Sequence, residues 1–214
     1  MNEHDGEPVR GLPERLPPGE QLLWQGAPDW RLLARSALHI DAVAVWFALF
    51  AAARVVSATM RAEPFSATAA AVLWIALPGA LAAALLGGFA WLIARTTVYT
   101  VTSRRLVIRL GIALPKAVDI PFAVIEQADL RRSDDGSGDI RLTLAPAERV
   151  SYLMLWPNVR AGRGRNGPVL RSLATVNEAA QVLGRALAAA AAQPAPVARI
   201  RTTREQEAPA AAVA

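Results

Sequence analysis

Two long apolar segments joined by a short polar connection constrain this chain more than any other feature of its sequence. The first covers about residues 40–60 and the second about 67–94, and no residue in the range 65–94 is charged. As helices that rise about 1.5 Å per residue, both are long enough to cross a hydrocarbon core of about 30 Å. The sequence therefore predicts a transmembrane helical hairpin over residues 40–94.

Arginine residues flank this apolar block mainly on the sides of the two chain termini. Those sides carry Arg31, Arg35, Arg95, Arg104, Arg105 and Arg109, whereas the connection between the spans carries Arg61. Positive residues next to membrane spans favour the cytoplasmic side. We therefore expect a multi-pass protein of a bacterial inner membrane with both termini in the cytoplasm.

The net charge of +5 raises the question of an anionic partner. The arginines are scattered over the C-terminal half and flank the apolar block, so the headgroups of membrane lipids are the expected partners and nucleic acid is not.

Three residues inside the spans are candidates for contact with a partner in the membrane. Arg54 either extends its guanidinium group outward to the headgroup level, which we favour, or contacts another helix or a lipid phosphate. Gly87 and Gly88 would permit close approach of a second helix, although an Ala-rich segment without a partner is the alternative. Pro78 predicts a bend or a tilt in the second span, which is longer than the membrane core.

The two ends of the chain show no regular pattern. Residues 1–39 are punctuated by proline and glycine and predict an irregular cytoplasmic lead-in without a cleavable signal peptide. In this lead-in, Trp30 is expected at the headgroup level, and Trp24 either lies there too or packs into a soluble domain. Residues 193–214 are of low complexity and predict a disordered tail.

Beyond residue 95 the apolar pattern changes to an alternation with a period of two, which predicts β-strands. We expect a hairpin within 96–111 and further strands at 117–122, 124–132, 140–145 and 149–156. The loop S-D-D-G-S-G-D has the chemistry of a hairpin turn, and a calcium site there is disfavoured because no glutamate closes it. Residues 176–192 predict a final helix, so 95–192 is expected to form an antiparallel β domain with a C-terminal helix.

The side chains needed for catalysis or metal binding are scarce. The chain has no cysteine, and its two histidines, His4 and His39, lie apart in the sequence. Adjacent acids occur at Asp134 and Asp135 in a turn, and no G-x-S-x-G motif is present. We therefore expect no catalytic, cofactor-binding or metal-binding residue and no enzyme activity. The Gly/Arg-rich loop at 158–168 is expected to be solvated or to face the membrane.

The segment R-T-T-V-Y-T-V-T-S-R-R-L-V-I-R-L-G at 95–111, directly after a pair of membrane helices, resembles the bacterial pleckstrin-homology-like (PH-like) membrane domains. The stretches P-V-R-G-L-P-E-R-L-P-P-G-E-Q-L-L-W-Q-G-A-P-D-W-R-L-L-A-R and G-D-I-R-L-T-L-A-P extend the resemblance, over about residues 8–190, to photosynthetic-complex assembly proteins of purple bacteria. The stretch A-G-R-G-R-N-G after Arg160 departs from that family, which has tryptophan and proline there.

This resemblance implies a homodimer that helps to assemble the reaction centre and the core light-harvesting antenna, light-harvesting 1, in the photosynthetic membrane. It implies a sheet closed by the C-terminal helix, and it brings no catalytic residue and no pigment ligand, so His39 is expected to be an interfacial residue. The fold class expected is thus an α+β membrane protein. The alternative function is a generic membrane-anchored module that binds lipid or protein, and a transporter is disfavoured because two spans with one charge cannot line a pathway.

Overall fold

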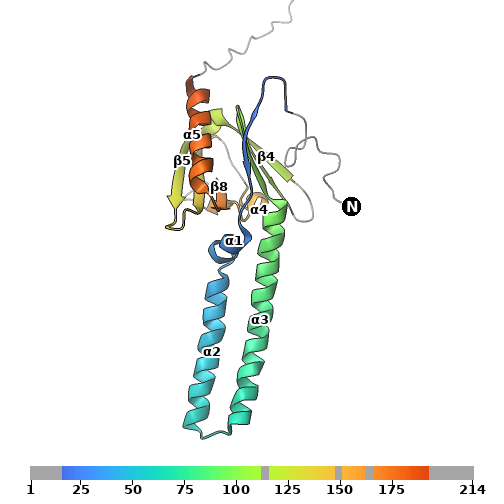
Figure 1. Ribbon diagram of the computed structural model, residues 1–214, viewed down its shortest axis with the longest axis vertical. Coiled ribbons are helices and arrows are strands. Elements are labelled where there is room, and N and C mark those ends of the chain that lie inside the picture. Colours follow the sequence, from blue (N-terminus) through green and yellow to red (C-terminus); the bar gives the residue numbers. More distant parts are fainter. Residues whose placement is uncertain (1–15, 112–115, 148–150, 162–165, 193–214) are drawn as a thin grey trace, which may run out of the picture.

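A long helical hairpin projects from one end of a β domain in the computed structural model, which describes residues 16–111, 116–147, 151–161 and 166–192 (Figure 1). The hairpin consists of α2, Ile40–Met60, and α3, Phe65–Thr96. The first span is as predicted, and the second extends beyond 67–94 at both ends and continues through Pro78. The predicted tail at 193–214 lies outside the described residues.

Both helices of the hairpin are long and apolar enough to cross a membrane, and they are almost wholly exposed. A core helix of a soluble protein would instead bury most of its apolar side chains. Together with the antiparallel sheets and the C-terminal helix, this confirms the predicted class of α+β membrane-anchored protein.

The first sheet contains strands from both sides of the hairpin. Its order is β1, Leu22–Gly26; β2, Val98–Thr102; β3, Arg105–Leu110; and β4, Lys116–Pro121. All neighbouring pairs are antiparallel, and β1 aligns Gly26 with Tyr99. The prediction of an irregular lead-in is therefore wrong at β1. The edge of β2 supplies the backbone hydrogen-bond partners of this strand, and the local sequence does not reveal them. Trp24 packs against the core, which decides between its two predicted positions.

The short helix α1, Trp30–Ser36, is a second correction to the predicted lead-in. Asp29 begins the helix because its Oδ1 accepts hydrogen bonds from the backbone N–H groups of Arg31 and Leu32, at 2.8 and 3.1 Å. Leu33 of this helix is fully buried. The helix therefore lies as a packed element between the β domain and the hairpin (Figure 1).

The second sheet is also antiparallel, in the order β5-β6-β8-β7. Its strands are β5, Ile125–Arg132; β6, Gly138–Leu144; β7, Val159–Ala161; and β8, Asn166–Leu173. A 3-10 turn η1, Phe122–Val124, connects the two sheets. The predicted turn between β5 and β6 is confirmed, with Gly136 at a φ of 82° that favours glycine.

The strand predicted at 149–156 is wrong, and a single helical turn, α4 at Tyr152–Leu155, stands there. Pro157 follows directly and has no backbone N–H for a sheet ladder, which disfavours a strand. The turn instead directs Leu155 into the core while Tyr152 and Trp156 stay exposed. Residues 148–150 lie outside the described residues.

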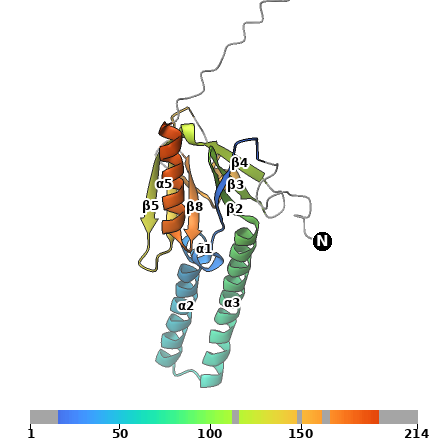
Figure 2. The same ribbon diagram turned by 45° about the horizontal axis from the view of Figure 1, so that its top comes forward.

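The core lies between the two sheets and the C-terminal helix α5, Val176–Ala192, which has the predicted bounds. The end of α5 with Val176 lies nearest the hairpin and the end with Ala192 farthest from it (Figure 2). Leu183 and Val176 are buried against the apolar faces of the strands, and Tyr99 is fully buried among them. The helix thus closes the sheets, as expected.

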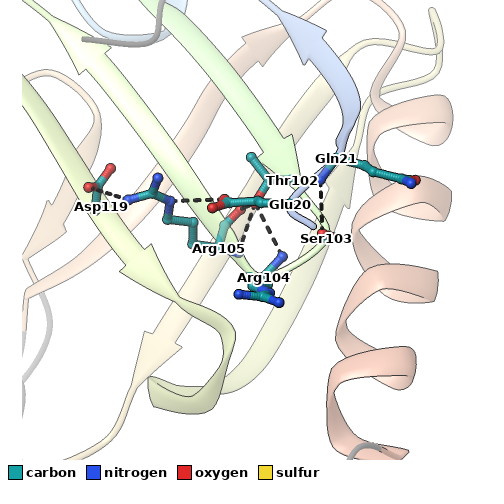
Figure 3. A network of polar contacts seen from close by, with 7 residues as sticks. All are labelled: Glu20, Gln21, Thr102, Ser103, Arg104, Arg105 and Asp119. Atoms are coloured by element: carbon teal, nitrogen blue, oxygen red, sulfur yellow. Dashed lines mark hydrogen bonds and ion pairs between the residues drawn. The ribbon is translucent and has the colours of Figure 1, made fainter. Parts of the chain in front are cut away.

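A polar network holds the segment before β1 on the first sheet (Figure 3). The Nε atom of Arg105 lies 3.0 Å from Oε1 of Glu20, and its Nη1 lies 2.9 Å from Oδ2 of Asp119. The side chain of Glu20 is only 3% exposed. Because a buried carboxylate is costly without a positive partner, this network fixes the lead-in against β3 and β4.

Candidate functional site

The membrane hairpin is the first candidate site, and Arg54 is its one charged residue between Ala42 and Met60. Arg54 extends toward the tip, as favoured from the sequence, and its Nη2 forms an ion pair with Oε2 of Glu63. Both side chains are about three-quarters buried. The pairing with Glu63 was missed because it depends on the fold of the tip, and it offsets the cost of an arginine within a span.

Three glycines of α3 divide into one that packs inside the hairpin and two that do not. A Cβ atom on Gly79 would lie 2.8 Å from Cγ of Phe47 in α2, so a glycine is needed for the close approach of the two helices there. A Cβ atom on Gly87 or Gly88 would meet nothing within 4 Å. Gly87 and Gly88, the two glycines predicted to contact a partner, are thus open to a second helix, whereas Gly79 packs within the hairpin.

Near the tip of the hairpin, α2 and α3 leave a groove of about 610 Å³ between them. Its lining is mostly apolar and includes Val55, Ala58, Phe65 and Val72. In a bilayer such a groove fits an acyl chain or the side chains of another apolar helix.

Aromatic and basic side chains mark the level at which the hairpin meets the β domain. The guanidinium carbon of Arg31 lies 5.1 Å from the ring centroid of Trp30, and that of Arg95 lies 5.3 Å from the ring centroid of Trp91. Tryptophan and arginine are typical of the headgroup region. The predicted interfacial position of Trp30 agrees with this arrangement.

Trp156 belongs to the same level and was missed in the sequence analysis. Its ring stacks on Phe89 of α3 with centroids 6.1 Å apart, and the residue is 39% exposed. The β domain therefore contacts the end of the membrane helix through an apolar side chain. This contact holds the β domain against the end of α3 that lies nearest to it.

Residues 42–188 match the family described as bacterial PH domain. The chain belongs to the bacterial PH domain family. The match begins within α2 and ends within α5, so it includes most of the hairpin as well as the strands after it. The PH-like fold predicted from residues 95–111 is thereby confirmed.

A curated relative of this PH domain protein is described as an uncharacterized 23.7 kDa protein in the puhA 5′ region of Rhodobacter capsulatus. The two chains are 39% identical over 168 residues, which cover 75% of this chain and 76% of the relative. No solved structure matches the chain.

Within the described part of the PH domain protein, no group of three or more His, Asp or Glu residues is arranged to hold a metal ion. Asp135, one of the two adjacent acids, is engaged in the β5–β6 turn. Its Oδ1 accepts hydrogen bonds from the hydroxyl and the backbone N–H of Ser137, at 2.6 and 3.0 Å, and these bonds lower the pKa of Asp135. The turn is therefore stabilised by the carboxylate itself.

His39 lies directly before α2 with a φ of 51°, in the left-handed region. Its exposed position at the start of the span agrees with an interfacial residue. The loop predicted at 158–168 is partly strand, because Val159–Ala161 pairs with β8, and residues 162–165 lie outside the described residues.

Proposed function

We propose that this chain is a non-enzymatic assembly factor for the photosynthetic reaction centre and the light-harvesting 1 antenna. Two findings of different kinds support the proposal. The relative from Rhodobacter capsulatus is described by its position in the puhA 5′ region, within a photosynthesis gene cluster. The resemblance of residues 8–190 to photosynthetic-complex assembly proteins agrees with that position.

The observation that carries the proposal is the exposed apolar surface of the hairpin. Its two helices pack on each other through Gly79, while Gly87 and Gly88 face open space. Helices in a bilayer associate through close packing at small residues, so this surface suits a single-span client such as an antenna polypeptide. Gly87 and Gly88 lie in the C-terminal half of α3, which leads directly into β2, so a client bound there would also reach the β domain.

Two arguments support the orientation that we propose. Strands β1 and β2 precede and follow the hairpin and pair with each other, so both ends of the hairpin lie on one side of the membrane. The excess of arginine on that side favours the cytoplasm. The proposed location is the bacterial inner, intracytoplasmic photosynthetic membrane, with both termini cytoplasmic and the tip on the opposite side.

Purification of tagged full-length protein in mild detergent, from cells induced to photosynthetic growth, tests this function. Mass spectrometry would identify copurified proteins, and an absorption spectrum would detect pigment. We expect enrichment of reaction-centre or antenna polypeptides and loss of most of this enrichment in a Gly87→Leu/Gly88→Leu variant. Arg54→Leu tests whether the third predicted residue also contributes to client binding.

The matched control is Ala52→Leu/Ala53→Leu, which adds nearly as much apolar bulk at two adjacent exposed positions of α2. It should leave the copurified proteins unchanged. A second copy with a different tag would test the proposed homodimer in the same experiment. If no photosynthetic subunit exceeds the amount found with an unrelated membrane protein, the assembly role is wrong and the generic lipid- or protein-binding module becomes the better account.

A further inference from the structure

A cavity of about 620 Å³ lies between α1, the residues just before α2, and the outer face of the second sheet. Its lining includes the arginines Arg35, Arg131, Arg141, Arg160 and Arg171, which come from five different elements. Among the described residues of this lining, Asp139 is the single acid. We call this site the arginine cavity.

The register of the second sheet brings these arginines together. Arg141 lies between two buried core residues of β6, so its side chain is on the opposite face of the sheet. Arg131 of β5 pairs with Asp139, which lies on the same face of β6 as Arg141. In β8, Arg141 pairs with Val169, and Arg171 lies two residues further along the strand. The arginines of neighbouring strands therefore form one outward-facing positive surface, which α1 covers from one side.

The positive charge of the arginine cavity is poorly balanced in the described part of the chain. Asp139 Oδ1 accepts a hydrogen bond from the backbone N–H of Ser172 at 2.8 Å, so this oxygen is already engaged by the backbone. The ion pair of Arg35 with Asp41 spans 3.7 Å, and its side chains are 69% and 70% exposed, so water screens it. Burial, followed by repulsion from Arg160, Arg131 and Arg171, lowers the pKa of Arg141.

Arg171 lines the cavity and is held by contacts of both its backbone and its side chain. Its Nε atom is buried and has no hydrogen-bond partner in the described part of the structure, while its Nη2 reaches the carbonyl oxygen of Val159 at 3.4 Å. The backbone N–H of Arg171 donates to the hydroxyl of the buried Tyr99 at 3.1 Å, which fixes this residue in the sheet. A guanidinium group that lines a cavity and is held in place by the sheet is suited to bind an anion.

The position of the cavity identifies the kind of anion. It is lined by Leu32, Arg35 and His39, and α2 starts at the next residue, Ile40. The cavity therefore lies beside α1, the helix that begins with Trp30, and Figure 1 shows this helix where the hairpin meets the β domain. In a membrane protein this is the level of the lipid headgroups. Phosphate groups of lipids are the anions concentrated at this level, and guanidinium groups bind phosphate through paired hydrogen bonds.

We propose that the arginine cavity binds the phosphate group of an anionic phospholipid headgroup. Such a ligand would neutralise arginines of α1 and of four strands at once, and so would hold the β domain against the membrane. The site does not depend on a photosynthetic client. It is therefore tested separately from the assembly function.

The test uses full-length protein in mild detergent and native mass spectrometry to count bound lipid. Phosphatidylglycerol is compared with phosphatidylcholine, which has the same phosphodiester but no net negative charge. The cavity variant is Arg141→Gln/Arg171→Gln, and the matched control is Arg132→Gln/Arg185→Gln, which removes the same charge from exposed positions outside the cavity. Glycerol 3-phosphate, added alone and as a competitor, tests a soluble source of phosphate.

We expect phosphatidylglycerol to bind more tightly than phosphatidylcholine, and the cavity variant to lose about tenfold or more of this affinity while the control loses less than about twofold. Without lipid, the cavity variant should unfold at the same or a higher temperature than the parent chain, because it relieves repulsion. Equal losses in both variants would overturn the site. Tight binding of glycerol 3-phosphate that displaces the lipid would overturn the lipid as its ligand.

Discussion

The hydroxyl oxygens of Ser36 and Ser172 lie 3.0 Å apart and join helix α1 to the last strand of the β domain. Ser172 makes two further hydrogen bonds through its backbone: its carbonyl oxygen accepts from Asp29 N at 2.8 Å, and its N–H donates to Asp139. It adopts a φ of 56° and is buried. Ser172 of β8 therefore joins helix α1, which lies directly before the hairpin, to the β domain through three hydrogen bonds.

Replacing either serine of this pair by alanine should have the same effect on stability. Ser36→Ala and Ser172→Ala each remove the hydroxyl contact, and each should lower the free energy of unfolding by about 1 kcal/mol. The double variant should lose little more than either single variant, because both remove one shared bond. Urea unfolding in detergent micelles, followed by tryptophan fluorescence, measures the three values. Fully additive losses would show that the two hydroxyls are not coupled.

Gly79→Ala should destabilise the hairpin, because the new methyl group would overlap the Phe47 side chain near its Cβ and Cγ atoms. Overpacking of this kind costs about 1–3 kcal/mol. Gly87→Ala is the matched control and should be neutral or slightly stabilising, since nothing lies within 4 Å of the added atom. Thermal unfolding in micelles compares them. Phe47→Ala in the Gly79→Ala background should restore part of the loss, and failure to do so would argue against this contact.

Arg105→Met should be among the most destabilising single changes in the first sheet. It leaves the buried carboxylate of Glu20 without its positive partner, which costs about 3 kcal/mol. Glu20→Gln in the same chain should recover much of this loss, because the unpaired charge is then removed. Asp119→Asn is the control: that side chain is 46% exposed, so its loss should be below about 1 kcal/mol. Equal effects of Arg105→Met and Asp119→Asn would contradict the buried pair.

The stability of the β domain should fall in alkaline solution because of Tyr99. Its hydroxyl donates to Asn158 Oδ1 at 2.6 Å, and burial raises its pKa well above the ordinary value of 10.0. A raised pKa in the folded state means that the folded chain holds this proton more tightly than the unfolded chain. The stability from neutral Tyr99 is therefore complete below about pH 10 and is lost as the pH rises further.

A Tyr152→Phe variant makes this measurement specific, because the chain has two tyrosines. Near-ultraviolet absorption then reports the ionisation of Tyr99 alone, while circular dichroism reports folding. We expect tyrosinate to form together with the loss of folded structure. Ionisation of Tyr99 near pH 10 in a chain that is still folded would show that the residue is not held neutral by burial.

The features that the sequence predicted are those encoded over short distances. The length of the apolar segments predicted both membrane helices, and the alternation around Tyr99 and Ile140 predicted strands. The same alternation would have placed Arg141 opposite the core. The alternation does not reveal the strand order β5-β6-β8-β7, however. That order gathers Arg131, Arg160 and Arg171 around the same cavity as Arg141.

The features that the sequence did not predict were missed for one shared reason. The partner of β1 lies beyond the entire hairpin, so residues 22–26 gave no local signal that they would pair. Likewise, the ion pair of Arg54 and Glu63 depends on the path of the tip between two helices. Sequence periodicity describes one element at a time, whereas these contacts arise only when distant elements meet.

The pairing of β1 with β2 also bears on how the protein is made. During synthesis β1 leaves the ribosome first, and its partner follows only after every residue of α2 and α3. The first sheet therefore cannot close until both helices have been inserted and the chain has returned to its starting side. A chain with a single inserted helix would leave β1 and β2 on opposite sides of the bilayer, with unpaired edges that quality-control proteases and chaperones could recognise. Closure of this sheet thus reports, within the molecule itself, that membrane insertion has been completed.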